Sequence, residues 1–222
     1  MNRKALMLVL GIFILGFAVR AGTPIAPPPE TKMDYGFTAL DEATMKALLK
    51  QGNLSIVRQR ANLTLINLTS GQLVNAPIDL CWKTIVDYES YPKFMPQTTA
   101  MKIVEKVDDR HTVTEQSIGV KIWRLPSVDI TYQMMQEMTP NTKLRFWQVK
   151  GDLPGTYGGW DLVPVGQQTM IFYTLYSNLT ALGWGLGGIF KAEPDFMTGV
   201  AVTTAMMVTK AVKEESERRA KK

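Results

Sequence analysis

The sequence predicts an α+β domain in which a curved antiparallel sheet of about seven strands wraps around one long C-terminal helix, with two short helices after the first strand. Three observations lead to this prediction. Residues 100–178 hold six stretches of alternating apolar and polar residues, separated by turn-forming residues. Residues 78–88 have helical spacing and interrupt the strand pattern after its first member. Pro194 and Asp195 then open a long helical segment that runs to about Arg219.

The N-terminal segment is typical of an exported protein. Arg3 and Lys4 precede an uncharged, mostly apolar run over residues 5–19, and Ala21 follows. A basic start, a short apolar middle and small residues after it indicate a secretory signal peptide that is cut after Ala21. We therefore expect a periplasmic or secreted protein. The alternative is that residues 1–21 stay in place as an N-terminal membrane anchor.

The rest of the chain divides into two parts. Residues 22–54 begin with a proline-rich stretch, which favours extended conformation and suits a tether. Residues 40–49 within this part have helical spacing and predict a short helix outside the main fold. Residues 55–222 form one domain that is long enough to bury a sizeable core.

Charge and rare residue types exclude several classes of function. Without the signal peptide, 25 − 3 = 22 basic residues face 20 acidic ones, so the chain lacks the basic excess of a nucleic-acid-binding protein. Cys81 is the only cysteine, which excludes disulfide frameworks and cysteine-cluster metal sites. His111 is the only histidine, which excludes multi-histidine metal sites. A Ser-His-Asp catalytic triad would have to use His111 as its base. We expect no cofactor, no metal and no nucleic-acid partner.

The expected elements follow one another in a simple order. Residues 55–74 predict a long bent strand, or a hairpin that turns at residues 69–71. Residues 78–88 form a helix that starts after Pro77, and residues 91–96 form a second very short helix or a turn. The six later strands are expected at residues 100–107, 111–120, 127–138, 142–150, 156–163 and 168–178.

A glycine-rich segment joins the last strand to the long helix. Residues 182–190 combine four glycines with large apolar side chains. No Lys-Ser or Lys-Thr pair follows the glycines, so a phosphate-binding loop is disfavoured. We expect a mobile apolar lid or a loop that touches a membrane, and we take it as the candidate gate.

Alternation along the strands predicts which side chains face the long helix. Between a bent sheet and its helix a cavity can form, lined by these inward residues. They are Ile130, Tyr132, Met134, Leu144, Phe146, Trp160, Leu162, Ile171, Tyr173 and Leu175. Ordinary core packing would need the same residues, so ligand contact and packing both remain open. The large residues of opposite parity are expected to pack under the N-terminal helix rather than to form a partner surface. They are Trp147, Met170, Phe172 and Tyr176.

Residues from the helices are expected to complete the cavity. Four residues of the C-terminal helix recur at i, i+4, i+7 and i+11, which places them on one face. They are Phe196, Val200, Thr203 and Met207. Tyr91, Phe94 and Met95 either cement the short helices to the sheet or lie at the mouth of the cavity.

Two segments of the sequence resemble a known superfamily. Residues 73–96, LVNAPIDLCWKTIVDYESYPKFMP, are similar to the opening of START-like, Bet v 1-related proteins, in the polyketide cyclase and coenzyme Q-binding START-type branch. Residues 151–162 and the alternating Thr169, Ile171, Tyr173 and Leu175 supply the second match. The resemblance covers about residues 55–215 and implies a helix-grip fold with a hydrophobic ligand cavity. It brings no invariant catalytic set.

Three functions remain open. The first is an exported START-like protein that binds a lipid, a sterol-like molecule or a quinone for transport or sequestration, with transient membrane contact and without catalysis. The second is a cyclase or dehydratase, which needs a buried acid or base. Its nearest candidates, Asp129, Glu137 and Asp161, have rim or outward parity. The third is an interaction module whose sheet is packed solid.

Overall fold

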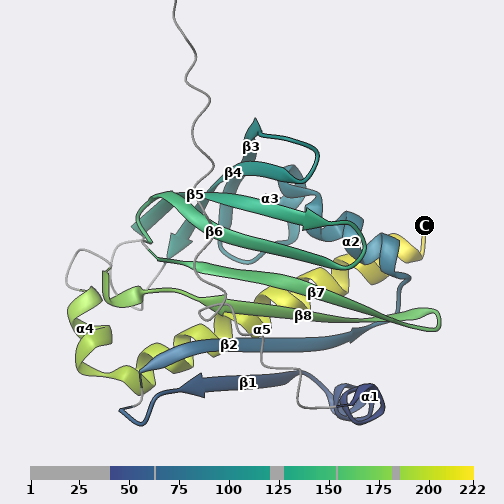
Figure 1. Ribbon diagram of the computed structural model, residues 1–222, viewed down its shortest axis with the longest axis horizontal. Coiled ribbons are helices and arrows are strands. Elements are labelled where there is room, and N and C mark those ends of the chain that lie inside the picture. The colour runs from purple at the N-terminus through teal and green to yellow at the C-terminus, as the bar shows by residue number, and fades with distance from the viewer. Residues whose placement is uncertain (1–40, 63, 121–127, 154, 182–185) are drawn as a thin grey trace, which may run out of the picture.

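Eight antiparallel strands form a single curved sheet in the order β1-β2-β8-β7-β6-β5-β4-β3, and helices cover much of one of its faces (Figure 1). The computed structural model describes residues 41–222 except 63, 121–127, 154 and 182–185. The predicted signal peptide, the predicted proline-rich tether and part of the glycine-rich segment therefore lie outside the described residues. The predicted sheet wrapped around a long C-terminal helix is confirmed, with eight strands rather than about seven.

The elements follow the predicted order closely. The strands are β1 (Leu54–Gln59), β2 (Leu65–Val74), β3 (Thr98–Lys106), β4 (His111–Val120), β5 (Val128–Thr139), β6 (Lys143–Gly151), β7 (Tyr157–Val165) and β8 (Gln168–Tyr176). The helices are α1 (Glu42–Gln51), α2 (Ile78–Val86), η2 (Tyr88–Ser90), α3 (Tyr91–Phe94), η3 (Leu179–Ala181), α4 (Leu186–Ala192) and α5 (Pro194–Ala220). In the described part of the chain, no helix is both long and apolar enough to cross a membrane.

The extra strand comes from the first β segment. The hairpin between β1 and β2 closes where the Arg60 amide donates to the Thr64 carbonyl, so the predicted turn at residues 69–71 is wrong. Gly71 instead lies inside β2. A β-carbon there would come within 2.7 Å of the Phe172 ring, so the glycine serves close packing between strand β2 and strand β8 rather than a turn.

Helix α1 packs on the outer face of the sheet, the face turned away from α5. Asp41 caps the helix by accepting from the Thr44 amide at 2.8 Å. Met45 and Leu49 then bury against Met170 and Phe172. The prediction that these two strand residues pack under the N-terminal helix is confirmed. The same prediction is wrong for Trp147 and Tyr176. These two residues pack in a separate cluster with Val113, Met135 and Tyr157.

Helix α5 crosses the inner face and contacts β2 more than any other strand (Figure 1). Its residues buried against the sheet are mostly small, because a helix can approach a strand closely only over short side chains. The Thr209 hydroxyl lies 3.3 Å from the Ser70 hydroxyl and accepts from Asn53 Nδ2 at 3.3 Å. The buried residues on this side are Met197, Ala201, Ala205, Thr209, Val212 and Ser216.

This orientation corrects the predicted apolar stripe. Phe196 is 50% exposed and Met207 is 40% exposed, and Thr203 is also exposed. Val200 is half-buried, in the smaller cluster around Leu65. The spacing of the four residues is helical, as predicted, but the helix turns its small residues toward the sheet. The side chains that α5 presents to the main core are Val208, Ala211 and Val212.

Candidate functional site

The inner face of the sheet gathers twelve of the seventeen predicted cavity residues into one apolar cluster with α2, α3 and α5. Eight of the twelve are buried and four are partly buried. The twelve residues are Tyr91, Phe94, Met95, Tyr132, Met134, Leu144, Phe146, Trp160, Leu162, Ile171, Tyr173 and Leu175. Strand parity placed the sheet residues correctly. Whether they contact a ligand stays a prediction.

Three aromatic rings form the centre of this cluster. Trp160 lies directly across from Tyr173 in the β7–β8 register, with ring centroids 4.7 Å apart. Phe146 stacks on Tyr173 at 5.9 Å. Its ring lies over Gly158, where a β-carbon would come within 2.6 Å of the ring and 2.2 Å of the Thr174 carbonyl oxygen. The glycine thus lets a large ring lie flat on the sheet.

The short helices hold a second aromatic group against the sheet. Tyr91 is buried, and its hydroxyl donates to the Ile85 carbonyl oxygen at 2.5 Å. Its ring meets Tyr88 edge-on at 5.9 Å and Phe94 at 5.4 Å. Because Tyr91 and Met95 are buried and Phe94 is only partly so, the first two pack the helices onto the sheet, and Phe94 is the member nearest solvent.

The inner cluster has apolar side chains at its margin that are only partly buried. Those on strands are Ile103, Tyr132, Met138, Tyr173 and Leu175. They are the part of the inner face that an apolar ligand could reach.

A chain of neutral polar groups borders the apolar cluster on β3, β4 and β5. The Tyr132 hydroxyl donates to Gln116 Oε1 at 3.1 Å, and Gln116 Nε2 donates to the Thr98 hydroxyl at 3.0 Å. We call Thr98, Gln116 and Tyr132 the polar ledge. Next to it, Gln136 Nε2 donates to the Thr114 hydroxyl at 3.0 Å. Sequence analysis missed these glutamines, although their inward parity could have indicated them.

The polar side chains described on the inner face are neutral. Burial raises the pKa of Tyr132 and of Tyr173 well above the ordinary value, so both phenols are neutral hydrogen-bonding groups at physiological pH. The candidate acids lie on the opposite parity, as expected. Glu137 pairs with Arg110 at 3.1 Å and Asp161 with Arg145 at 2.6 Å, and Asp129 is exposed. Among the described residues, Glu215 is the one buried charged side chain.

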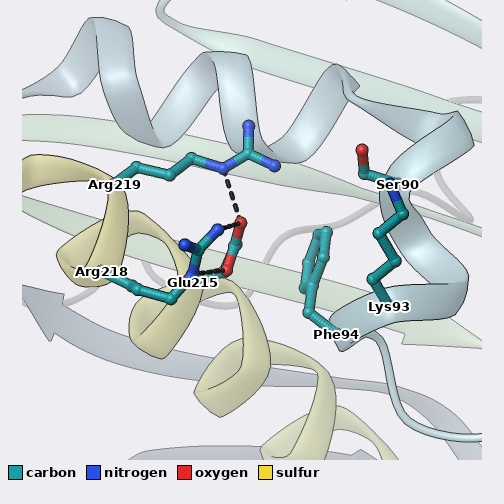
Figure 2. Close-up of a pocket in the computed structure, with 6 residues that line it drawn as sticks. All are labelled: Ser90, Lys93, Phe94, Glu215, Arg218 and Arg219. Atoms are coloured by element: carbon teal, nitrogen blue, oxygen red, sulfur yellow. Dashed lines mark hydrogen bonds and ion pairs between the residues drawn. The ribbon is translucent and has the colours of Figure 1, made fainter. Parts of the chain in front are cut away.

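A hollow of about 320 Å³ lies where the C-terminal end of α5 meets η2 and α3. Figure 2 shows Ser90 and Lys93 on one side of the Phe94 ring and Glu215 with its two arginines on the other. Phe94 belongs both to this hollow and to the inner apolar cluster, so the two regions adjoin. The full lining is Ser90, Lys93, Phe94, Glu215, Arg218 and Arg219.

An ion-pair network shapes the hollow. Arg218 binds both oxygens of Glu215 at 2.7 Å. Arg219 bridges Glu215 and Asp87 at 2.7 Å each, and its guanidinium lies 5.9 Å from the centre of the Phe94 ring. Hydrogen bonds from Arg218, and then from Arg219, lower the pKa of Glu215 to about 2. The carboxylate is therefore ionised at every physiological pH.

Other candidate residues take no part in this site. Cys81 is buried on α2, and desolvation raises the pKa of its thiol, as expected for an inert packing residue. His111 binds Asp108 in the β3–β4 turn. The part of the chain that the structure describes holds no cluster of three or more metal-ligating side chains. Of the predicted gate, residues 182–185 fall outside the described residues, and Leu186–Ala192 form α4.

Comparison with known proteins identifies the family. The family model described as polyketide cyclase/dehydrase and lipid transport matches residues 74–211. No curated protein matches the sequence. Among solved structures, the Zhui aromatase/cyclase from Streptomyces sp. R1128 superposes with a TM-score of 0.56 at 18% identity, covering 69% of this chain and 94% of that one.

Two further structures share the fold. A STAR-related lipid transfer protein from Xanthomonas axonopodis has a TM-score of 0.57 at 17% identity and covers 75% of this chain and 94% of its own. A protein from Thermus thermophilus has a TM-score of 0.58 at 16% identity, with coverages of 68% and 97%. Identities this low establish a common fold and leave the ligand to be argued from the site.

Proposed function

Because the chain belongs to the polyketide cyclase/dehydrase and lipid transport family, we propose that it binds one hydrophobic molecule on the inner face of its sheet and carries or sequesters it. The observation that supports this most is the accessible apolar surface among Phe94, Tyr132, Tyr173 and their neighbours. Each methylene that a ligand buries there is worth about 0.8 kcal/mol, so an apolar chain binds without any specific contact.

The polar ledge narrows the proposed ligand to a neutral molecule that carries a hydroxyl or carbonyl oxygen. The Tyr132 hydroxyl can turn from Gln116 to a ligand carbonyl, or accept a hydrogen bond from a ligand hydroxyl. Thr98, Gln116 and Tyr132 carry no charge to pair with an ionised ligand, and an unpaired charge is costly to bury. Quinones, sterol-like molecules and neutral acyl lipids all meet this description.

A direct test removes one hydroxyl. Purified protein is stripped of lipid and titrated with a short-tailed benzoquinone, a fluorescent sterol and a fluorescent diacylglycerol. We expect at least one to bind, and Tyr132→Phe to weaken the oxygen-bearing probe about threefold to tenfold, the worth of one hydrogen bond. Tyr176→Phe, on the outer face, is the matched control and should bind normally. If no probe binds the wild type, and native mass spectrometry finds no copurified lipid, the proposal is wrong.

The N-terminal segment supports a second part of the proposal, that the protein works outside the cytoplasm. A carrier that encloses an apolar ligand can move it across an aqueous compartment between membranes. Expression of the whole chain followed by N-terminal sequencing tests this. We expect the mature chain to begin at Gly22 and to lie in the soluble periplasmic or secreted fraction. A full-length chain held in the membrane would instead identify residues 1–21 as an anchor.

A cyclase or dehydratase is the second candidate. The two neutral phenols Tyr132 and Tyr173 favour it, since a phenol can hydrogen-bond to a substrate carbonyl. The outward placement of Asp129, Glu137 and Asp161 disfavours it, because none can take a proton from a substrate on the inner face. Turnover of an aromatic polyketide analogue that is lost in Tyr132→Phe would establish catalysis in place of simple binding.

A further inference from the structure

The hollow between α3 and α5 carries more positive charge than its single carboxylate neutralises. Lys93, Arg218 and Arg219 line it together with Glu215. When Asp87, which Arg219 also binds, is counted, three cations face two anions. Of the three cations, Arg219 is partly buried beside the Phe94 ring, whereas Lys93 and Arg218 are exposed and within reach of a ligand from solvent.

Two of the three cations keep free hydrogen-bonding capacity. Arg218 uses two of the five N–H donors of its guanidinium on Glu215. Lys93 has no ion-pair partner among the residues that the structure describes. The hydroxyl of Ser90 lines the same hollow, and Figure 2 shows the Lys93 side chain extended along the wall that carries Ser90. Arg219, by contrast, is held by both Glu215 and Asp87.

We propose that this hollow binds an oxyanion, a phosphate or a carboxylate, through Lys93, Arg218 and Ser90. The volume of about 320 Å³ accommodates such a group. The charge of the Glu215 carboxylate is offset by the two arginines that bind its oxygens, so its repulsion of an anion is reduced. A multidentate anion on ammonium, guanidinium and hydroxyl donors makes the charge-assisted hydrogen bonds that are strongest in proteins.

The anion can come from two sources, which differ in whether an apolar tail passes Phe94. Either it is a free anion, or it is the head group of an amphiphile whose tail passes Phe94 into the inner apolar cluster. Only the second source rests on the proposed function. It would extend the ligand class from neutral molecules to those with an anionic end that stays outside the neutral inner face.

The test uses the full-length mature protein and three probes: inorganic phosphate, a short-chain lysophosphatidate, and the monoacylglycerol with the same chain. We expect the lysophosphatidate to bind at least about tenfold more tightly than the monoacylglycerol, with the gain shrinking as salt increases. Lys93→Gln should abolish the gain. Lys210→Gln, which removes the same charge from an exposed position on α5, is the matched control and should keep it.

Each outcome decides the inference separately from the proposed function. If phosphate alone binds and Lys93→Gln removes that binding, the site takes a free anion. If the lysophosphatidate binds more tightly than the monoacylglycerol and phosphate alone does not bind, the site takes a head group. Equal affinity for the charged and neutral probes, with no phosphate binding, overturns the inference and leaves the apolar site intact. The same holds if Lys93→Gln and Lys210→Gln behave alike. Ser90→Ala, with a weaker loss of the same gain, checks that the anion sits in the hollow.

Discussion

The inner and outer faces of the sheet are both apolar, and they differ in what covers them. On the outer face, Met45 and Leu49 of α1 close over Met170 and Phe172, and all four are at most 4% exposed. The inner face packs against α2, α3 and α5, and Tyr132 is one of the partly buried side chains at the margin of its cluster. The outer cluster has partly buried neighbours as well. Partial exposure is therefore common to both faces, and the ligand titrations decide which face binds.

The faces also differ in the kind of polarity they carry. The outer face has charged pairs such as Arg145 with Asp161, which remain in contact with water. The inner face has the amide and hydroxyl groups of the polar ledge, which are neutral. The hollow beside Phe94 carries positive charges next to the inner cluster. Under the two proposals, a neutral ligand oxygen binds at the polar ledge and an anion binds in the hollow.

The strongest test of this comparison truncates one large ring on each face. Phe146→Ala and Phe172→Ala should each lower the free energy of unfolding by about 3–5 kcal/mol, because each removes a buried phenyl group. Only Phe146→Ala should also weaken binding of the apolar probes. Chemical denaturation and probe titration measure the two effects. Equal binding loss in both variants would mean that the faces do not differ in function.

A smaller effect is expected from adding one methyl group on each face. Gly158→Ala forces a β-carbon to 2.2 Å from a backbone oxygen, and we expect a cost near the upper end of about 1–3 kcal/mol for overpacking. Gly71→Ala meets the Phe172 ring at 2.7 Å, which can shift, so it should cost less. Thermal unfolding compares the two. The opposite order would show that the sheet backbone yields more easily than the ring under α1.

The ion pairs that line the hollow predict a pH dependence. The pKa of Glu215 is lowered from 4.5 to about 2, so its contribution to stability is complete above pH 4.5 and is lost as the pH falls toward 2. Unfolding temperatures measured across this window should drop in the wild type, and Glu215→Gln should remove part of that drop. Glu214→Gln, at an exposed neighbouring position, is the control. A Glu215→Gln profile parallel to the wild type would contradict the network.

The smallest effects are expected on the outward side of α5. Phe196→Gln and Met207→Gln should each lower the free energy of unfolding by no more than about 1 kcal/mol, because about half of each side chain is already exposed to water. Ala205→Leu, on the buried side of the same helix, should destabilise clearly by overpacking against β2. Urea unfolding of the three variants checks this orientation. A large loss in Met207→Gln would restore the predicted stripe as the buried face.

Strand parity made most of the candidate site predictable. Successive side chains point to opposite faces of a sheet, so choosing one inward residue on a strand assigns the others. Tyr132 with Met134, and Ile171 with Tyr173, follow this rule. The same rule would have found Gln116 and Gln136, but a search for apolar residues passes over amides. The hollow was not predictable, because its residues come from η2, α3 and the far end of α5.

The sequence by itself determined the order of the elements, the alternation of the strands and the family, since these depend on local periodicity and on motifs such as residues 73–96. Only the tertiary structure decided the rotation of α5. This helix carries apolar residues on more than one side, and its orientation depends on the close fit of Ala201, Ala205 and Thr209 to strand β2. Helical spacing shows which residues share a face, but the surface opposite determines which face is buried.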